Sequence, residues 1–130
     1  LAIHQKKYIG KLSAFCGAVS AGYACGAAIT YMLGGNFNQI ANTIINTLAN
    51  TSGIICDGAK PSCAAKISSA LDAALLAHTM SMHDDVFHAD EGIVKDDLEK
   101  TIRAVGYIGR EGMKSTDIEV LNIMIDKVCP

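Results

Sequence analysis

Apolar residues in this chain return every three or four positions, the spacing of a helix that is buried on one side. Runs that alternate apolar and polar residues, as half-buried strands do, do not stand out, and only Gly53–Ile55 has the character of a short extended segment. The pattern predicts an all-α fold, a single compact helical domain of about five helices.

The first half of the chain contains a long stretch without any charged side chain, from residue 12 to residue 56. Its opening part, Ser13–Leu33, is long enough to cross a bilayer. A membrane span is nevertheless disfavoured, because the hydrophobicity comes largely from alanine with interspersed glycine. Small residues recur every four positions and form one smooth face: Ala14, Ala18, Gly22, Gly26 and Thr30. We therefore expect a buried Gly/Ala-rich central helix that its neighbours approach closely.

A second helix is predicted near Phe37–Thr51, where two stripes follow the helical repeat. One stripe is aliphatic, and the other consists of asparagines: Asn38, Asn42, Asn46 and Asn50. Uncharged polar side chains are unusual on a solvated helix face, where lysine and glutamate predominate. The asparagine stripe fits two structures equally well, a half-buried wall that hydrogen-bonds a polar ligand or a missing domain, and an exposed polar face.

Three more helices are expected in the second half, separated by a loop around residues 83 to 92. Asp96 or Asp97 can begin the penultimate helix and Gly112 can end it, while Ser115 or Thr116 can begin the last. The predicted ranges are Pro61–His83, Lys95–Arg110 and Ser115–Lys127.

Composition narrows the class of protein. The 130 residues are enough for one domain with its own core, half of them are hydrophobic and only 5% are aromatic, which suits close helix packing. A net charge of −2 with mixed signs provides no basic face for nucleic acid. The five cysteines are an odd number in a chain that is not loop-rich, so reduced thiols and a cytoplasmic location are expected rather than a disulfide framework.

The segment Cys56–Cys63 places two thiols on either side of a turn that leads into a helix. Gly58 loosens the backbone, and Pro61 suits the first helical position, where its missing N–H costs nothing. Cys63 then falls in the first helical turn, where free N–H groups and the helix dipole favour a thiolate. The spacing alone matches neither a zinc ribbon nor a ferredoxin pattern.

Three blocks of the sequence resemble the serine dehydratase alpha-chain-like proteins, and more narrowly their L-cysteine desulfidase (UPF0597) branch. The most specific block is the segment GIICDGAKPSCAAK at Gly53–Lys66. The second is LSAFCG at Leu12–Gly17, followed by YMLGG at Tyr31–Gly35. The third combines EGIV at Glu91–Val94, TIR at Thr101–Arg103 and IGREGM at Ile108–Met113, although Tyr107 stands where the family pattern leads us to expect arginine. That departure weakens an anion-binding role for this segment.

The resemblance implies a [4Fe-4S] cluster held by Cys16, Cys56 and Cys63, with Asn46, Asp57 and Lys60 in the surrounding site. It implies β-elimination from L-cysteine or L-serine, giving pyruvate and ammonia. Lys60 and Lys66 lie near enough in sequence to offset the negative charge of the cluster. From the residues alone, three buried cysteines without a metal remain the alternative, in a helical structural or interaction domain.

The same resemblance implies that residues 1–130 are the C-terminal, cluster-binding part of a longer protein. The missing N-terminal domain is then a partner of this segment and the expected source of the general base. We expect the segment by itself to be inactive, the cluster to be absent if the domain is isolated in air, and a homodimer to be a reasonable assembly.

Other potential ligands are less specific. Cys25 lies nine residues after Cys16, so on a common helix it points elsewhere and is expected in the core. Cys129, near the end of the chain, could reach back to an open iron. The segment His78–Glu91 is rich in metal-ligand types and offers an alternative divalent-metal module, but it matches no defined metal-binding spacing.

Overall fold

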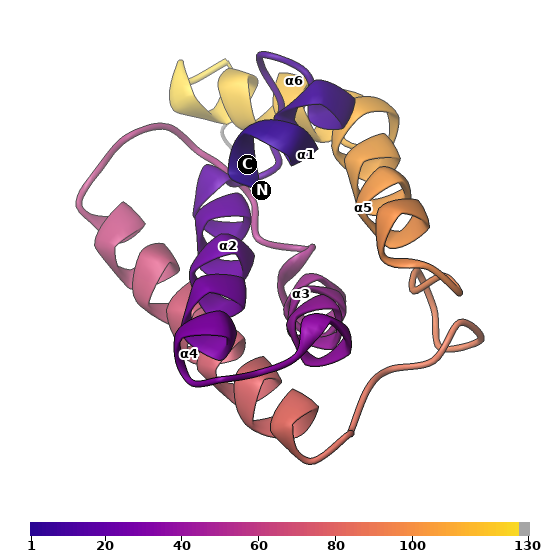
Figure 1. The fold of residues 1–130 in the computed structure, drawn as a ribbon. Coiled ribbons are helices and arrows are strands. Elements are labelled where there is room, and N and C mark those ends of the chain that lie inside the picture. The colour runs from indigo at the N-terminus through magenta and orange to yellow at the C-terminus, as the bar shows by residue number, and fades with distance from the viewer. Residues whose placement is uncertain (128–130) are drawn as a thin grey trace.

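The computed structural model describes residues 1–127, and Cys129 therefore lies outside the described residues. Six α-helices and one π-helical turn succeed one another along the chain (Figure 1). Within residues 1–127 the only β pairing is an isolated antiparallel bridge between Phe15 and Ile55. The elements are α1 (Ala2–Ile9), α2 (Gly17–Met32), α3 (Phe37–Thr51), α4 (Ser62–Met82), α5 (Leu98–Tyr107), η1 (Ile108–Gly112) and α6 (Lys114–Met124). The all-α prediction is confirmed.

Helices α2, α3 and α4 form the centre of the fold, and α2 packs against both of the others (Figure 1). A Cβ atom on Gly22 would stand 2.8 Å from the carbonyl oxygen of Ala70, and one on Gly26 would stand 3.0 Å from the Cβ of Ala74. The missing side chains therefore allow the backbones of α2 and α4 to approach closely. The predicted Gly/Ala-rich central helix is confirmed, and no described helix is both long enough and apolar enough to cross a membrane.

Polar side chains within this centre are hydrogen-bonded rather than exposed. The hydroxyl of Thr30 lies 2.9 Å from the hydroxyl of Thr43 and 2.9 Å from Nδ1 of His78, which links α2, α3 and α4. Thr47 and Thr51 on α3 each donate to the carbonyl four residues earlier. Because a buried polar group is costly only when it lacks a partner, these threonines can line a packed helix interface.

The predicted bounds of α3 are confirmed, and a capping box explains its start. Asn36 Oδ1 accepts from the backbone N–H of Gln39 at 3.0 Å, and Gln39 Oε1 accepts from the N–H of Asn36 at 2.9 Å. Two donors at the helix end are thereby satisfied by side chains. Helix α4 also matches its prediction closely, with Pro61 at the N-cap position.

Three expectations differ from the structure at the ends of elements. Helix α2 begins at Gly17 instead of Ser13, because the preceding residues are extended and pair with Ile55. Helix α5 begins after Asp97, which caps it as predicted, and continues into η1, which ends at Gly112. Helix α6 begins at Lys114 without a side-chain cap.

Helix α1 was not predicted, and it packs on α5 (Figure 1). Its buried residues are Gln5 and Ile9, so one of its two inward positions is polar and the apolar repeat is weak. The contact with α5 is close, since a Cβ on Gly106 would collide with the Cβ of Tyr8. By contrast α6 has no buried residue, and Ile118, Leu121 and Ile123 are exposed.

Candidate functional site

Cys16 and Cys56 are brought together by the isolated bridge. The N–H of Cys16 donates to the carbonyl of Ile54 at 3.1 Å, and the N–H of Cys56 donates to the carbonyl of Ala14 at 2.6 Å. Each cysteine directly follows a bridged residue, so both side chains point to the same face of the two paired segments. The two cysteines are diagonal neighbours across the bridge, and such neighbours are roughly 7–8 Å apart. Backbone hydrogen bonds thus fix these two thiols relative to each other.

Cys63 lies in the first turn of α4, as predicted, and its sulfur is held by the turn that precedes the helix. The backbone N–H of Lys60 donates to Sγ at 3.4 Å, and the thiol donates to the carbonyl of Gly58 at 3.4 Å. Gly58 has φ of +90°, a conformation that glycine adopts without strain. These two contacts fix the sulfur of Cys63 relative to the turn.

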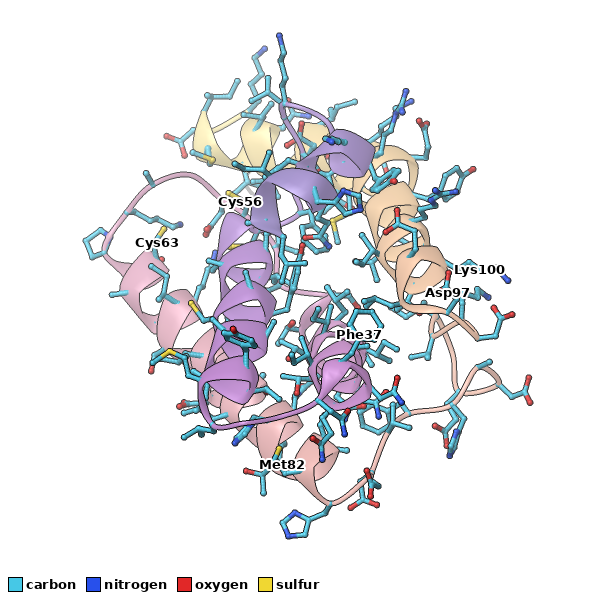
Figure 2. All side chains as sticks on the ribbon, viewed as in Figure 1. Phe37, Cys56, Cys63, Met82, Asp97 and Lys100 are labelled. Carbon is cyan, nitrogen blue, oxygen red and sulfur yellow. The ribbon has the colours of Figure 1, made fainter. Side chains whose placement is uncertain are left out.

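All three predicted cysteines line one pocket of about 340 Å³. Figure 2 shows Cys56 and Cys63 at the same end of the helical core, near the starts of α2 and α4. Cys16 is 6% exposed and the other two are half-buried. The remaining lining comes from small or apolar residues: Gly17, Ala18, Ala21, Gly58, Ala59 and Ile67.

The potential metal-binding atoms that line this pocket are the three thiol sulfurs. Nowhere in residues 1–127 do three Cys, His, Asp or Glu side chains converge closely enough to hold one metal ion. A cluster of several irons and sulfides is wider than one ion, so its ligands stand farther apart. Three thiols around an otherwise apolar pocket match the ligand type that such clusters take.

Asp57, directly after Cys56, forms ion pairs with Lys60 and Lys66. Hydrogen bonds from Lys60 and then Lys66 lower the pKa of Asp57 to about 2. The carboxylate is therefore ionised near neutral pH, and the trio leaves one net positive charge beside the cysteines. A neighbouring pocket of about 500 Å³ contains these three side chains and extends to Ile123 and Met124 of α6.

Lys66 contributes more than the sequence indicated. Beyond its general charge, Nζ of Lys66 donates to the carbonyl of Ile55 at 2.8 Å and to the carboxylate of Asp57. Its position one helical turn after Cys63 was the available signal, since residues three apart share a helix face. The extended course of residues 54–57 beside that face was not readable from the sequence.

Asn46 does not line the pocket of the cysteines. It is 1% exposed, its Nδ2 donates to the carbonyl of Asp85 at 3.0 Å, and its Oδ1 accepts from the N–H of Phe87 at 3.0 Å. The side chain therefore fastens the loop after α4 to α3. The asparagine stripe is accordingly mixed, because Asn38 and Asn50 are exposed.

Cys25 is exposed, so its predicted place in the core is wrong. The inward face of α2 at that level is formed by Gly22 and Gly26, which turns the cysteine to solvent. In the segment His78–Glu91, the two histidines nearest the helix end are hydrogen-bonded within the fold, His78 to Thr30 and His83 to the carbonyl of Thr79. The described residues thus offer the divalent-metal alternative no converging ligand set.

This chain is similar to one protein family and to individual bacterial proteins. The family described as serine dehydratase alpha chain matches residues 1–122. A protein of Treponema denticola described as "UPF0597 protein" is 59% identical over 125 residues, which are 96% of this chain and 29% of that protein. Proteins with the same description from Finegoldia magna and Lachnoclostridium phytofermentans are 54% and 56% identical over 98% and 97% of this chain, and 30% of each protein.

The chain spans about 30% of the length of these curated relatives. No solved structure matches the chain. The predicted family is confirmed.

Proposed function

We propose that this chain, which belongs to the serine dehydratase alpha chain family, forms the cluster-binding part of an iron–sulfur-dependent lyase. The observation that carries the proposal is that Cys16, Cys56 and Cys63 line one pocket although they come from three separate segments. The reaction is β-elimination from L-serine or L-cysteine. Loss of water or hydrogen sulfide gives aminoacrylate, which takes up water to yield pyruvate and ammonia.

Cys16, Cys56 and Cys63 would hold a [4Fe-4S] cluster through their thiolates, and the group when bound would supply a Lewis acid for loss of the leaving hydroxyl or thiol. The chain's own residues prepare for such a group. Cys16 and Cys56 are fixed by the backbone bridge, and Cys63 meets the N–H groups at the start of α4. Lys60 and Lys66 provide positive charge that balances thiolates in this pocket.

We assign the remaining steps of the reaction to the region that the longer relatives have in addition to the part matched by this chain. The base that removes the Cα proton is proposed to lie there, because among residues 1–127 no histidine, carboxylate or lysine lines the cysteine pocket. Asn46 is proposed to act at a distance, by holding residues 85–87 against α3. Asp57 and Lys60 are proposed to act beside the thiols, where their charges meet a small zwitterionic substrate.

The test is anaerobic reconstitution with iron and sulfide, read by metal and sulfide content and by the visible absorbance of the cluster. Cys16→Ala, Cys56→Ala and Cys63→Ala are each expected to lose uptake. Cys25→Ala is the matched control and is expected to retain it, because this exposed residue lies outside the pocket. Uptake that survives all three substitutions would contradict the ligand set, and no uptake in the parent chain would favour an interaction domain without a cluster.

A further inference from the structure

The ammonium group of Lys66 contacts both neighbours of Cys56. Its Nζ donates to the backbone carbonyl of Ile55 at 2.8 Å and pairs with the carboxylate of Asp57. Lys66 belongs to α4, one turn after Cys63. A single side chain therefore links the helix that carries Cys63 to the extended segment that carries Cys56.

The other contacts around the cysteines do not perform this task. The bridge relates Cys56 to Cys16, and the sulfur of Cys63 bonds only to the turn directly before its own helix, at Gly58 and Lys60. Lys60 also pairs with Asp57, but its side chain makes no hydrogen bond to a backbone group in residues 1–127. Lys60 is thus a natural control for Lys66, with the same carboxylate partner and without the backbone contact.

The chemistry of lysine suits this position. An ammonium group offers three donors that can serve a carbonyl and a carboxylate at once. The side chain of Lys66 is 23% exposed, compared with 45% for Lys60, so its contacts compete less with water. The hydrogen bond that the ammonium group donates to the carboxylate of Asp57 also raises the pKa of Lys66, which keeps the group charged.

We propose that Lys66 is a positioning residue that sets the separation between Cys56 and Cys63. The inference rests on the proposed function, because this separation matters for catalysis only when the three thiols bind one cluster. Arginine is a poor replacement, since its planar guanidinium is larger and cannot occupy the same point between the two acceptors.

The first measurement uses metal-free protein, so that it does not depend on the cluster. Lys66→Met is expected to increase amide hydrogen exchange in residues 54–58 about tenfold, as expected when a charge-assisted hydrogen bond that holds a segment is lost. Lys60→Met is expected to leave exchange in this segment within about twofold of the parent. Equal increases in both variants, or no increase in Lys66→Met, would overturn the role of Lys66.

The second measurement uses reconstituted protein and follows the loss of iron to a chelator. Lys66→Met is expected to release iron about tenfold faster than the parent, with Lys66→Arg between them and Lys60→Met close to the parent. If Lys66→Met does not fold, Asp57→Asn provides the test. It removes the carboxylate that both lysines pair with and leaves the Lys66 contact with Ile55 in place, so exchange in residues 54–58 is expected to rise by less than about tenfold over the parent. A rise of about tenfold or more would overturn the role of the contact between Lys66 and Ile55.

The two proposals fail in different ways. A parent chain that takes up no iron and sulfide contradicts the proposed function whatever hydrogen exchange shows. A parent that takes them up, with Lys66→Met equal to it in exchange and in iron release, contradicts the role of Lys66 alone.

Discussion

The helical centre and the cysteine segment of this protein are stabilised in different ways. In the centre, α2 lies against α3 and α4 through small residues, and the glycines at positions 22 and 26 permit the closest approach. In the cysteine segment Cys56–Cys63, by contrast, two backbone hydrogen bonds, one turn and the side chain of Lys66 determine where the thiols stand. Many weak packing contacts hold the first region, and a few directional contacts hold the second.

The difference separates stability from site geometry. A change in the centre alters the packing of three helices at once, so it should lower the free energy of unfolding of the whole domain. A change in the cysteine segment should move the ligands while most of the helical core remains.

The largest effect is expected from Gly22→Val, because its side chain would collide with the backbone of Ala70. We expect a loss of about 3 kcal/mol in the free energy of unfolding, from forced separation of α2 and α4. Urea denaturation followed by circular dichroism measures it. Ala28→Val, on the exposed side of the same helix, is the control, and a similar loss in both variants would show that helix propensity rather than packing is responsible.

Asn46→Ala should have the next largest effect, since it removes the partners of the Asp85 carbonyl and the Phe87 N–H. We expect a loss of about 2 kcal/mol in the free energy of unfolding, with faster hydrogen exchange in residues 84–88. The control is Asn50→Ala, which removes an exposed member of the same stripe. An Asn46→Ala protein as stable as Asn50→Ala would mean that water replaces both hydrogen bonds.

Gly58→Ala tests the cysteine segment itself. Its φ of +90° is unfavourable for a residue with a Cβ, so we expect a loss of about 1 kcal/mol in the free energy of unfolding. Cluster uptake should fall by a larger fraction than the free energy of unfolding does. Gly53→Ala is the control, because a Cβ there meets open space without a positive φ. Unchanged uptake in Gly58→Ala would show that the turn does not control the position of Cys63.

The smallest effect concerns the polar contact of α1 with α5, where Glu99 accepts hydrogen bonds from Tyr8 at 2.6 Å and from His4 at 2.9 Å. These bonds lower the pKa of Glu99 from 4.5 to about 2. The unfolded chain therefore binds the proton more readily, and the stability from Glu99 is present above pH 4.5 and is lost as the pH falls toward 2. After solvent screening it amounts to at most about 1 kcal/mol.

Unfolding at pH 2.5 and pH 6 in the parent and in Glu99→Gln measures this contribution. The difference between the two proteins should shrink at the lower pH. Glu119→Gln serves as control, because the carboxylate of Glu119 has no hydrogen-bond or ion-pair partner within residues 1–127. A difference between parent and Glu99→Gln that stays constant with pH would contradict the contribution of the carboxylate.

The fold was predictable where local signals agree with tertiary burial. The bounds of α3 followed from its helical repeat, and the Gly/Ala face of α2 correctly indicated a close crossing. Helix α1 escaped prediction because one of its two buried residues is Gln5. In α4 the large residues Ile67 and Leu71 are exposed while Ala70 and Ala74 face the core, so a repeat of large side chains alone would select the wrong face.

The three cysteines of the candidate pocket could be named from the sequence, whereas their arrangement in space could not. The residues near Cys56 and Cys63 carry a specific motif, and Cys63 falls in the first turn of α4 as the preceding turn and proline indicated. Cys25 was misplaced because the identity of the packed face of α2 depends on what α3 and α4 supply opposite it. The same limit applies to Lys66, whose partners belong to an extended segment nine to eleven residues earlier.

The helical class, the uncharged central helix and the three thiols of the proposed cluster site can therefore be identified from the order of the residues alone. Local repeat, turn chemistry and small residues act over a few positions, and these are visible along the chain. Three further features emerge only once the helices have packed: Cys16 lies beside Cys56, Asn46 holds a distant loop, and Lys66 joins α4 to the segment that carries Cys56. Each of these depends on hydrogen bonds between residues brought together by the packing of α2, α3 and α4, a relation that no local pattern encodes.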